Sequence, residues 1–256
     1  MSRNVHPAAA DGFGASADAY ERGRPDYPGA AVAHLLGTLA VGPGTVVADL
    51  AAGTGKLTRL LIPSGADVIA VEPVEAMRRR LMEIVPQARA IDGTAESMPL
   101  SDASVDAVTV AQAFHWFDAP RAVEEIARVL RPGGGIGLIW NVRDERVPWV
   151  AELTGIMEPH RSGTPTHRTA IWRQAFDESD RFTDLTKRSF PYEQHLTPAL
   201  VVDRVVSVSF IAALPDEERD TVAAQVRDLL ARDADTRGRE DIVMPYRTDV
   251  YTAARR

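Results

Sequence analysis

A glycine-bearing turn and an acidic residue one strand later are the first residues whose types and spacing suggest ligand binding. In the segment DLAAGTGKLTRLL, Gly53 and Gly55 directly follow a short β-branched run, and Glu72 follows the next such run, DVIAV. Gly53 and Glu72 are 19 residues apart. An acidic side chain at roughly 20 residues from such a turn binds ribose hydroxyls in nucleotide-binding α/β folds. The pattern therefore predicts a ligand that carries a ribose.

Two common phosphate-binding motifs do not fit this turn. A P-loop needs Gly five positions before the Gly-Lys pair and Ser or Thr after it, but Leu50 and Leu57 stand there. The dinucleotide fingerprint needs a third small residue three positions after the second Gly, where this chain has Thr58. Since a pyrophosphate site is disfavoured, we expect a nucleoside that lacks phosphates.

The elements that must position these residues alternate between strands and helices. Apolar and β-branched runs predict strands at 45–50, 67–71, 88–91, 105–110 and 135–140. Helical patterns separate several of them, the last at about 120–130, and RPGGG is expected to form a turn. Alternating strands and helices imply parallel pairing with right-handed crossovers, so we expect an α/β fold with a doubly wound, mostly parallel sheet.

Beyond residue 140 the alternation stops, and we expect a helical cap over the ligand pocket. Helices are predicted around 149–157 and 169–176, separated by the turn-rich HRSGTPTH, and two more near 198–214 and 215–232. A connection of this length is too long for a simple crossover. The tail 241–253 alternates as a last strand, in which Pro245 indicates a sheet edge or a bend.

Composition excludes several classes of protein. The chain has 45% hydrophobic and 25% charged residues, a formal charge of −7 and a pI near 5.4. This acidic balance disfavours binding to nucleic acid or to an anionic membrane, since both need clustered positive charge. The absence of cysteine excludes disulfides, thiolate zinc sites and cysteine nucleophiles, and it fits a reducing compartment. No signal-peptide pattern and no apolar run of about 20 residues is present. We expect a soluble cytoplasmic protein.

Four motifs in the correct order resemble those of the class I S-adenosylmethionine-dependent methyltransferases with a type 11 domain. They are VVADLAAGTGKLT, VIAVEP, GTAESMPLSDASVDAVTVAQAFHWFD and EEIARVLRPGG, between about residues 46 and 140. With FGASADAYERGRPDYP near the N-terminus, the chain is similar to the small-molecule branch that includes trans-aconitate methyltransferase. The resemblance implies a Rossmann-like, seven-stranded methyltransferase sheet, S-adenosyl-L-methionine as cofactor and a small-molecule methyl acceptor as partner.

The same resemblance divides the chain and assigns cofactor contacts. It implies an N-terminal cap segment (1–30), a cofactor-binding core (31–141), and a region (142–256) that holds the substrate cap and C-terminal strands of the same sheet. Asp49, Gly53 and Gly55 would frame the methionine part of the cofactor, and Glu72 would bind both ribose hydroxyls. Many relatives have Asp where this chain has Thr94, so Glu96 is an alternative contact for the adenine amino group. The cofactor residues so implied are Tyr20, Arg24, Asp49, Ala51, Gly53, Gly55, Glu72, Pro73, Thr94, Ala95, Glu96 and Ala111.

Residues after the fourth and fifth strands are the candidates for the acceptor side. His115 has an imidazole suited to general-base catalysis, and its alternative role is to form an aromatic wall with Trp116 and Phe117. We expect Trp116, Trp140 and Asn141 to bind the acceptor, with plain packing as the alternative for the last two. The type of methylated group, oxygen, nitrogen or carboxyl, stays open, and a carboxylate acceptor would need no base.

Three other functions are possible for such a chain: cofactor binding without turnover, nicotinamide-dependent oxidoreduction and metal binding. A protein that binds the cofactor without turnover remains an alternative, whereas Thr58 and the later motifs disfavour a nicotinamide oxidoreductase. Glu158, His160 and His167 show no repeated ligand spacing, so no metal site is expected. Arg22, Arg24 and Arg143 fall in segments expected near the pocket mouth, where they would suit an anionic acceptor.

Overall fold

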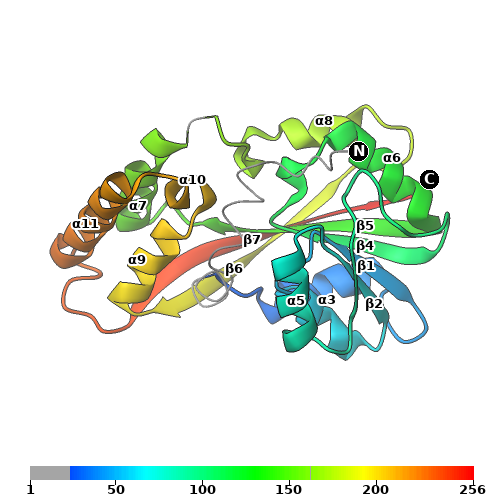
Figure 1. Ribbon diagram of the computed structural model, residues 1–256, viewed down its shortest axis with the longest axis horizontal. Helices are drawn as coiled ribbons and strands as arrows, with labels where there is room; N and C mark the ends of the chain where they lie inside the picture. The colour runs from blue at the N-terminus through cyan, green and yellow to red at the C-terminus, as the bar shows by residue number, and fades with distance from the viewer. Residues whose placement is uncertain (1–23, 162) are drawn as a thin grey trace.

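A seven-stranded sheet forms the centre of the computed structural model, which describes residues 24–161 and 163–256 (Figure 1). The strand order is β3-β2-β1-β4-β5-β7-β6. The pairs among β1 to β5 are parallel, and β7 runs antiparallel to both β5 and β6. The predicted doubly wound, mostly parallel α/β fold is confirmed. The strands are β1 Val46–Leu50, β2 Asp67–Val71, β3 Arg89–Ile91, β4 Val105–Ala111, β5 Leu130–Arg143, β6 Thr186–Leu196 and β7 Ile242–Ala254.

Helices cover both faces of the sheet, which explains why its inner strands read as nearly unbroken apolar runs. On one face, α3 (Gly29–Thr38), α4 (Thr58–Leu61) and α5 (Glu75–Ile84) share a buried core with the sheet. On the other face, α6 (Ala119–Val129) and α8 (Ile171–Asp177) do the same. Figure 1 shows α3 and α5 below the strands and α6 and α8 above them.

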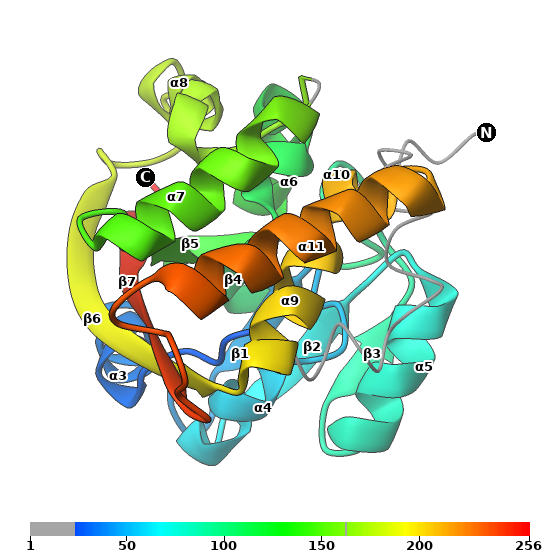
Figure 2. The same cartoon turned by 90° about the vertical axis from the view of Figure 1, so that its left-hand side faces the viewer.

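A third core lies at the far ends of β6 and β7. There α7 (Pro148–Met157), α9 (Pro198–Val206), α10 (Ser209–Ala212) and α11 (Asp216–Arg232) pack around the strands. Figure 2 shows α7 and α11 running side by side across this end of the molecule. The helices expected at 149–157 and 169–176 are thus present as α7 and α8.

Two elements were not anticipated from the sequence. The first is helix α3, and the second is strand β6, whose Pro191 argues against a strand. Since β6 is the outermost strand next to β7, a residue without an N–H is tolerated there. In addition, RPGGG is not a turn between elements, because β5 begins at Leu130 and shifts register against β4 before Gly135.

Two expectations for the C-terminal half were wrong. The helix expected over 198–214 is interrupted, because Val208 adopts extended angles (φ −66°, ψ 132°) between α9 and α10. Pro245 does not mark a sheet edge, since β7 lies between β5 and β6. Pro245 is tolerated in β7 because the β5–β7 pairing ends at Arg143 and Tyr246. Pro245, the neighbour of Tyr246 in the chain, lies just beyond that last pair. In the part of the chain that the structure describes, no helix is both long and apolar enough to cross a membrane.

Candidate active site

The loop after β1 turns tightly because three of its residues adopt left-handed backbone angles. Ala51, Gly53 and Gly55 have φ values of 54°, 58° and 91°. A Cβ atom on Gly55 would lie 3.0 Å from Val85 Cγ2 and 3.1 Å from Leu81 Cγ, so this glycine lets the loop pack against the side chains of the α5 region. A Cβ atom on Gly53 would meet none of the residues that the structure describes within 4 Å. Gly53 therefore faces open space, as a loop that receives a ligand should.

Glu72 connects this loop to the end of β2. Its Oε2 accepts a hydrogen bond from the Gly53 N–H at 2.9 Å, and its Oε1 accepts one from the Val74 N–H at 2.8 Å. The side chain is only 5% exposed, and burial raises the pKa of Glu72 against the lowering effect of these two N–H groups. A carboxylate has about four lone-pair sites, so two remain for hydroxyl donors. The geometry therefore suits the ribose contact that the spacing predicts.

Asp49 is turned toward its own neighbours in the fold. Its two carboxylate oxygens accept hydrogen bonds from Thr58 Oγ1 at 2.6 Å and Thr109 Oγ1 at 2.8 Å. Burial raises the pKa of Asp49 to about 6. The side chain thus links the loop helix α4 to strand β4, and its negative charge lies directly beneath the loop.

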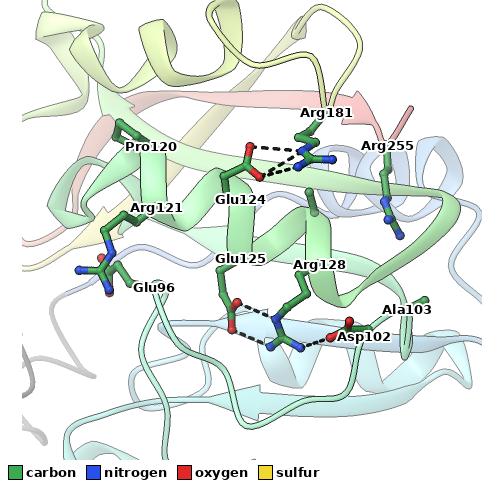
Figure 3. A pocket seen from close by; sticks show the side chains of 11 residues that line it. Glu96, Asp102, Ala103, Pro120, Arg121, Glu124, Glu125, Arg128, Arg181 and Arg255 are labelled. Atoms are coloured by element: carbon green, nitrogen blue, oxygen red, sulfur yellow. Dashed lines mark hydrogen bonds and ion pairs between the residues drawn. The ribbon is translucent and has the colours of Figure 1, made fainter.

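The turn expected to border the adenine is closed by its own backbone. Thr94 and Ser97 exchange N–H to carbonyl hydrogen bonds of 3.2 Å, and Ala95 is buried inside the turn. The Glu96 carboxylate accepts the Asp118 N–H at 3.0 Å, at the N-terminus of α6, which attracts negative charge. It also lines a groove beside α6 (Figure 3). The Glu96 carboxylate thus has a partner within the fold, and its contact with the adenine stays a prediction. Pro73 lies just after β2 and Ala111 is the last residue of β4.

A cavity of about 170 Å³ opens where β4 and β5 end under the cap; we call it the inner cavity. It brings together Arg24, His115, Trp116 and Asn141, which the sequence analysis proposed as cofactor, catalytic or acceptor residues. Further lining residues come from the β4 and β5 ends, the segment from α7 to the short 3-10 helix η4 (His167–Thr169), and the α9 to α10 region. These include Gln112, Arg143, Thr154, Arg161, His167, Arg168, Arg204 and Tyr246.

Trp140 does not reach the inner cavity. It is fully buried, and its ring packs 4.7 Å from the ring of Trp172 and 5.7 Å from that of Tyr251, measured between centroids. Packing, the alternative role for this residue, is what the structure supports. Asn141 accepts a hydrogen bond from Thr248 Oγ1 and donates one to the Asp26 carbonyl. Tyr20 lies outside the described residues.

His115 is held as a neutral imidazole. Burial, reinforced by the charges of His167 and Arg161, lowers the pKa of His115 to about 3. Its ring centroid lies 5.1 Å from that of Trp116 and 6.5 Å from that of His167. The Nδ1 atom is buried and has no hydrogen-bond partner among residues 24–161 and 163–256. Because a base is most effective when its pKa is near the working pH, this environment favours a hydrogen-bonding or packing role over general-base catalysis.

Five arginines line the inner cavity, and the sequence analysis singled out only Arg24 and Arg143. Arg161 and Arg168 flank the turn-rich HRSGTPTH and form ion pairs with Glu158 and Glu145. Arg204 was detectable in principle, since it is a single charge on the apolar face of ALVVDRVV and is only 7% exposed. No aspartate or glutamate lines the cavity among the residues of known position, and the same residues include no cluster of acidic and histidine side chains that could hold a metal.

Comparison with known proteins identifies relatives over nearly the whole chain. A family model described as a methyltransferase domain matches residues 48–138. An uncharacterized methyltransferase of Mycobacterium tuberculosis is 44% identical over 236 residues, 92% of each chain. An uncharacterized methyltransferase-like protein of Schizosaccharomyces pombe is 32% identical over 235 residues, 91% of each chain. A solved structure described as a methyltransferase from an antibiotic biosynthesis pathway of Anabaena variabilis superposes with a TM-score of 0.64 at 21% identity, covering 90% of this chain and 98% of its own.

Proposed function

Since the chain belongs to the class I S-adenosylmethionine-dependent methyltransferases, we propose that it binds S-adenosyl-L-methionine and methylates a small molecule. The observation that carries the proposal is the pairing of Glu72 with the Gly53 N–H beside open space. This pairing fixes a hydroxyl-binding carboxylate next to a loop that a ligand can approach closely. The ends of β1, β2 and β4 then surround one site, as ligand sites do in open α/β sheets.

When bound, the cofactor supplies a methyl group on a sulfonium, which is already activated for transfer. The task left to the protein is to orient the two reactants and exclude water, and orientation alone is worth on the order of 7 to 11 kcal/mol. In this proposal Glu72 holds the ribose and the turn at Ala95 borders the adenine. Asp49 places negative charge under the loop that faces the cationic end of the cofactor.

The inner cavity supports a small acceptor. Its volume of about 170 Å³ is below the roughly 300 to 1,000 Å³ of pockets that hold drug-sized ligands. Burial also lowers the pKa of His167, to about 4, so neither histidine of the cavity is an effective base at neutral pH. Among oxygen, nitrogen and carboxyl acceptors, this favours one that arrives deprotonated and needs no base. The cysteine-free sequence supports a cytoplasmic location.

Cofactor binding is tested by calorimetry with S-adenosylhomocysteine on the wild type and on Glu72→Gln. The substitution replaces a charged acceptor of hydroxyl protons by a neutral amide, so affinity should fall by about ten- to a hundredfold, the range for hydrogen bonds to a charged group. Glu75→Gln is the matched control, because Glu75 is exposed and its ion pair is with the exposed Arg79. Equal affinities of wild type and Glu72→Gln would remove Glu72 from the site.

Turnover separates an enzyme from the alternative, a protein that binds the cofactor without catalysis. Purified protein is incubated with methyl-labelled S-adenosylmethionine and a small-molecule cell extract. We expect label to pass into low-molecular-weight products in the wild type and at a strongly reduced rate in Glu72→Gln. Tight S-adenosylhomocysteine binding without any transfer to extract components would favour the alternative.

A further inference from the structure

A second cavity, of about 550 Å³, lies against the inner cavity; we call it the outer cavity. It is bounded by the segment after β5, the start of α8 and the strands β6 and β7. The two cavities share Val142, Arg143, His167 and Arg168. The outer cavity therefore has a wall of side chains in common with the expected acceptor site.

The outer cavity carries an excess of positive charge in an acidic protein. Three acidic side chains line it, Asp144, Glu145 and Asp249, against six cationic ones. The cationic residues are Arg143, Arg146, Arg168, Arg173, Lys187 and Arg247. Six positive against three negative charges leave an excess of three, whereas the whole chain has a formal charge of −7.

The acidic residues of the outer cavity are already bound to cationic partners. Asp144 pairs with Arg146 at 2.6 Å, and Glu145 pairs with Arg168. Asp249, which is almost fully buried, accepts from Arg247 at 2.7 and 2.9 Å and from Ser189 at 2.7 Å, and it pairs with Lys187 at 2.8 Å. These carboxylates are bound to Arg146, Arg168, Arg247 and Lys187, which leaves none of them for Arg143 or Arg173. Lys187 keeps further donors for a ligand, because an ammonium group has three N–H bonds.

Two cationic side chains meet at a single aromatic ring. Arg173 Cζ lies 5.6 Å and Lys187 Nζ 5.3 Å from the ring centroid of Tyr251. Within the residues that the structure places, Arg173 forms no ion pair with a carboxylate. The Nε of Arg143 is buried and has no hydrogen-bond acceptor in the described part of the chain. Burial, together with the charges of Arg24 and Arg168, lowers the pKa of Arg143 against the raising effect of Tyr246.

The groove beside α6 shows what a self-compensated basic surface looks like in this protein (Figure 3). It is larger, at about 750 Å³, and it also contains several arginines. There Arg181 pairs with Glu124 at 3.0 Å, and Arg128 pairs with both Glu125 and Asp102 at 2.7 Å. Its acidic and basic groups neutralise each other, so the groove offers no comparable attraction to an anion.

We propose that the outer cavity is a binding site for an oxyanion of the phosphate or carboxylate kind, held by Arg173 and Lys187 beside Tyr251. Guanidinium and ammonium groups form their strongest hydrogen bonds with such oxyanions. The site is separate from the methyl-transfer site and requires no turnover. Because Arg143 and Arg168 line both cavities, an anion bound there contacts the wall of the inner cavity.

The test is calorimetric titration of the full chain with inorganic phosphate and, separately, with succinate, at constant ionic strength set by chloride. Arg173→Gln and Lys187→Gln should each raise the half-saturating concentration roughly tenfold or more, as expected for loss of a charge-assisted hydrogen bond. Arg181→Gln, in the groove of Figure 3, should leave both titrations unchanged. Binding of one anion alone would identify the chemistry that the site selects.

Two outcomes would overturn the proposal: no saturable binding of either anion to the wild type, or equal binding by the wild type and both outer-cavity variants. Arg173→Glu is the second variant at the same position and should abolish binding by reversing the charge. Melting curves without anion show that each variant is folded. Saturating S-adenosylhomocysteine is added in a parallel series, so that loss of cofactor binding is recognised independently of anion binding.

Discussion

Asp49 and Glu72 are two buried carboxylates in one site, and their environments treat the negative charge differently. The charge of Glu72 is offset by two backbone N–H groups and lies near Arg78, whose guanidinium donates to the Glu72 carbonyl at 2.7 Å. Asp49 has two threonine hydroxyls and no cationic partner among its hydrogen-bond donors. Its charge is therefore the more costly one to bury in the protein without cofactor.

Asp49→Asn should stabilise the protein without cofactor at neutral pH. The pKa of Asp49 rises from 3.8 to about 6 on folding, so the folded state binds the proton more tightly than the unfolded state. The stability from this group is complete below pH about 4 and is lost as the pH rises through about 6. Above that range the variant should exceed the wild type by at most about 3 kcal/mol. Urea unfolding of both proteins from pH 4 to 8 measures this difference, and a difference that does not change with pH would contradict the prediction.

His115→Ala should change turnover only modestly. A general base would account for about 10²- to 10⁴-fold in rate. Because the pKa of His115 is lowered to about 3, its protonation state does not change between pH 5 and 8. We expect a rate loss below about tenfold and the same shape of the kcat profile over that pH range in variant and wild type. A limb near pH 6 to 7 that is present only in the wild type would establish His115 as the base.

At the scale of elements, the two glycines of the β1 to α4 loop should separate folding from binding. Gly55→Ala introduces a Cβ at φ 91° within 3.1 Å of Leu81 and Val85, so it should destabilise the fold by about 2 to 4 kcal/mol. Gly53→Ala meets open space at φ 58° and should cost only about 1 kcal/mol. It should instead weaken S-adenosylhomocysteine binding by roughly tenfold, since the methyl group occupies the ligand's approach. Urea unfolding and calorimetry on both variants test the pair, and equal effects of the two substitutions on both quantities would refute the separation.

The strands of the cofactor half could be predicted because each is specified by local residues, whereas helix α3 was missed. The β-branched run before Gly53 and the acidic residue that ends the next strand are local patterns, and their strands pair as expected. The inner cavity could not be predicted in this way, because its arginines come from distant parts of the chain and meet only through the fold. Strand β6 was missed for a related reason. Its alternation through Phe190, Tyr192 and Leu196 is visible, but Pro191 is acceptable only at an edge, and the sheet order decides which strand is the edge.

Across the whole molecule, charge is segregated rather than evenly distributed. The chain is acidic overall, yet cationic side chains from β5, β6, β7 and the segments around η4 and α8 converge on the two adjoining cavities. At physiological ionic strength, the repulsion between an anion and exposed charges more than about 8 to 10 Å away is largely screened. The attraction between an anion and charged side chains inside a cavity is screened much less. Under the proposed anion site, we therefore expect anions to bind where these side chains converge.

Two of the hydrophobic cores, the one around the ends of β6 and β7 and the one under the cofactor loop, should also behave as separate units of stability. Leu229, which is fully buried in α11, belongs to the core around the ends of β6 and β7, and Leu81, equally buried in α5, belongs to the core under the cofactor loop. Each Leu→Ala substitution should cost about 2 to 5 kcal/mol within its own unit. In native-state hydrogen exchange, Leu229→Ala should lower the protection of α7, α9 and α11 while β1, β2 and β4 keep theirs, because sub-global units open independently. S-adenosylhomocysteine affinity should stay near the wild-type value, since Glu72 and Gly53 lie in the other unit.

Leu81→Ala is the reciprocal variant and should weaken both the protection of β1 and β2 and the affinity for S-adenosylhomocysteine. Equal loss of protection across all these elements in both variants would show that the chain unfolds as one cooperative unit.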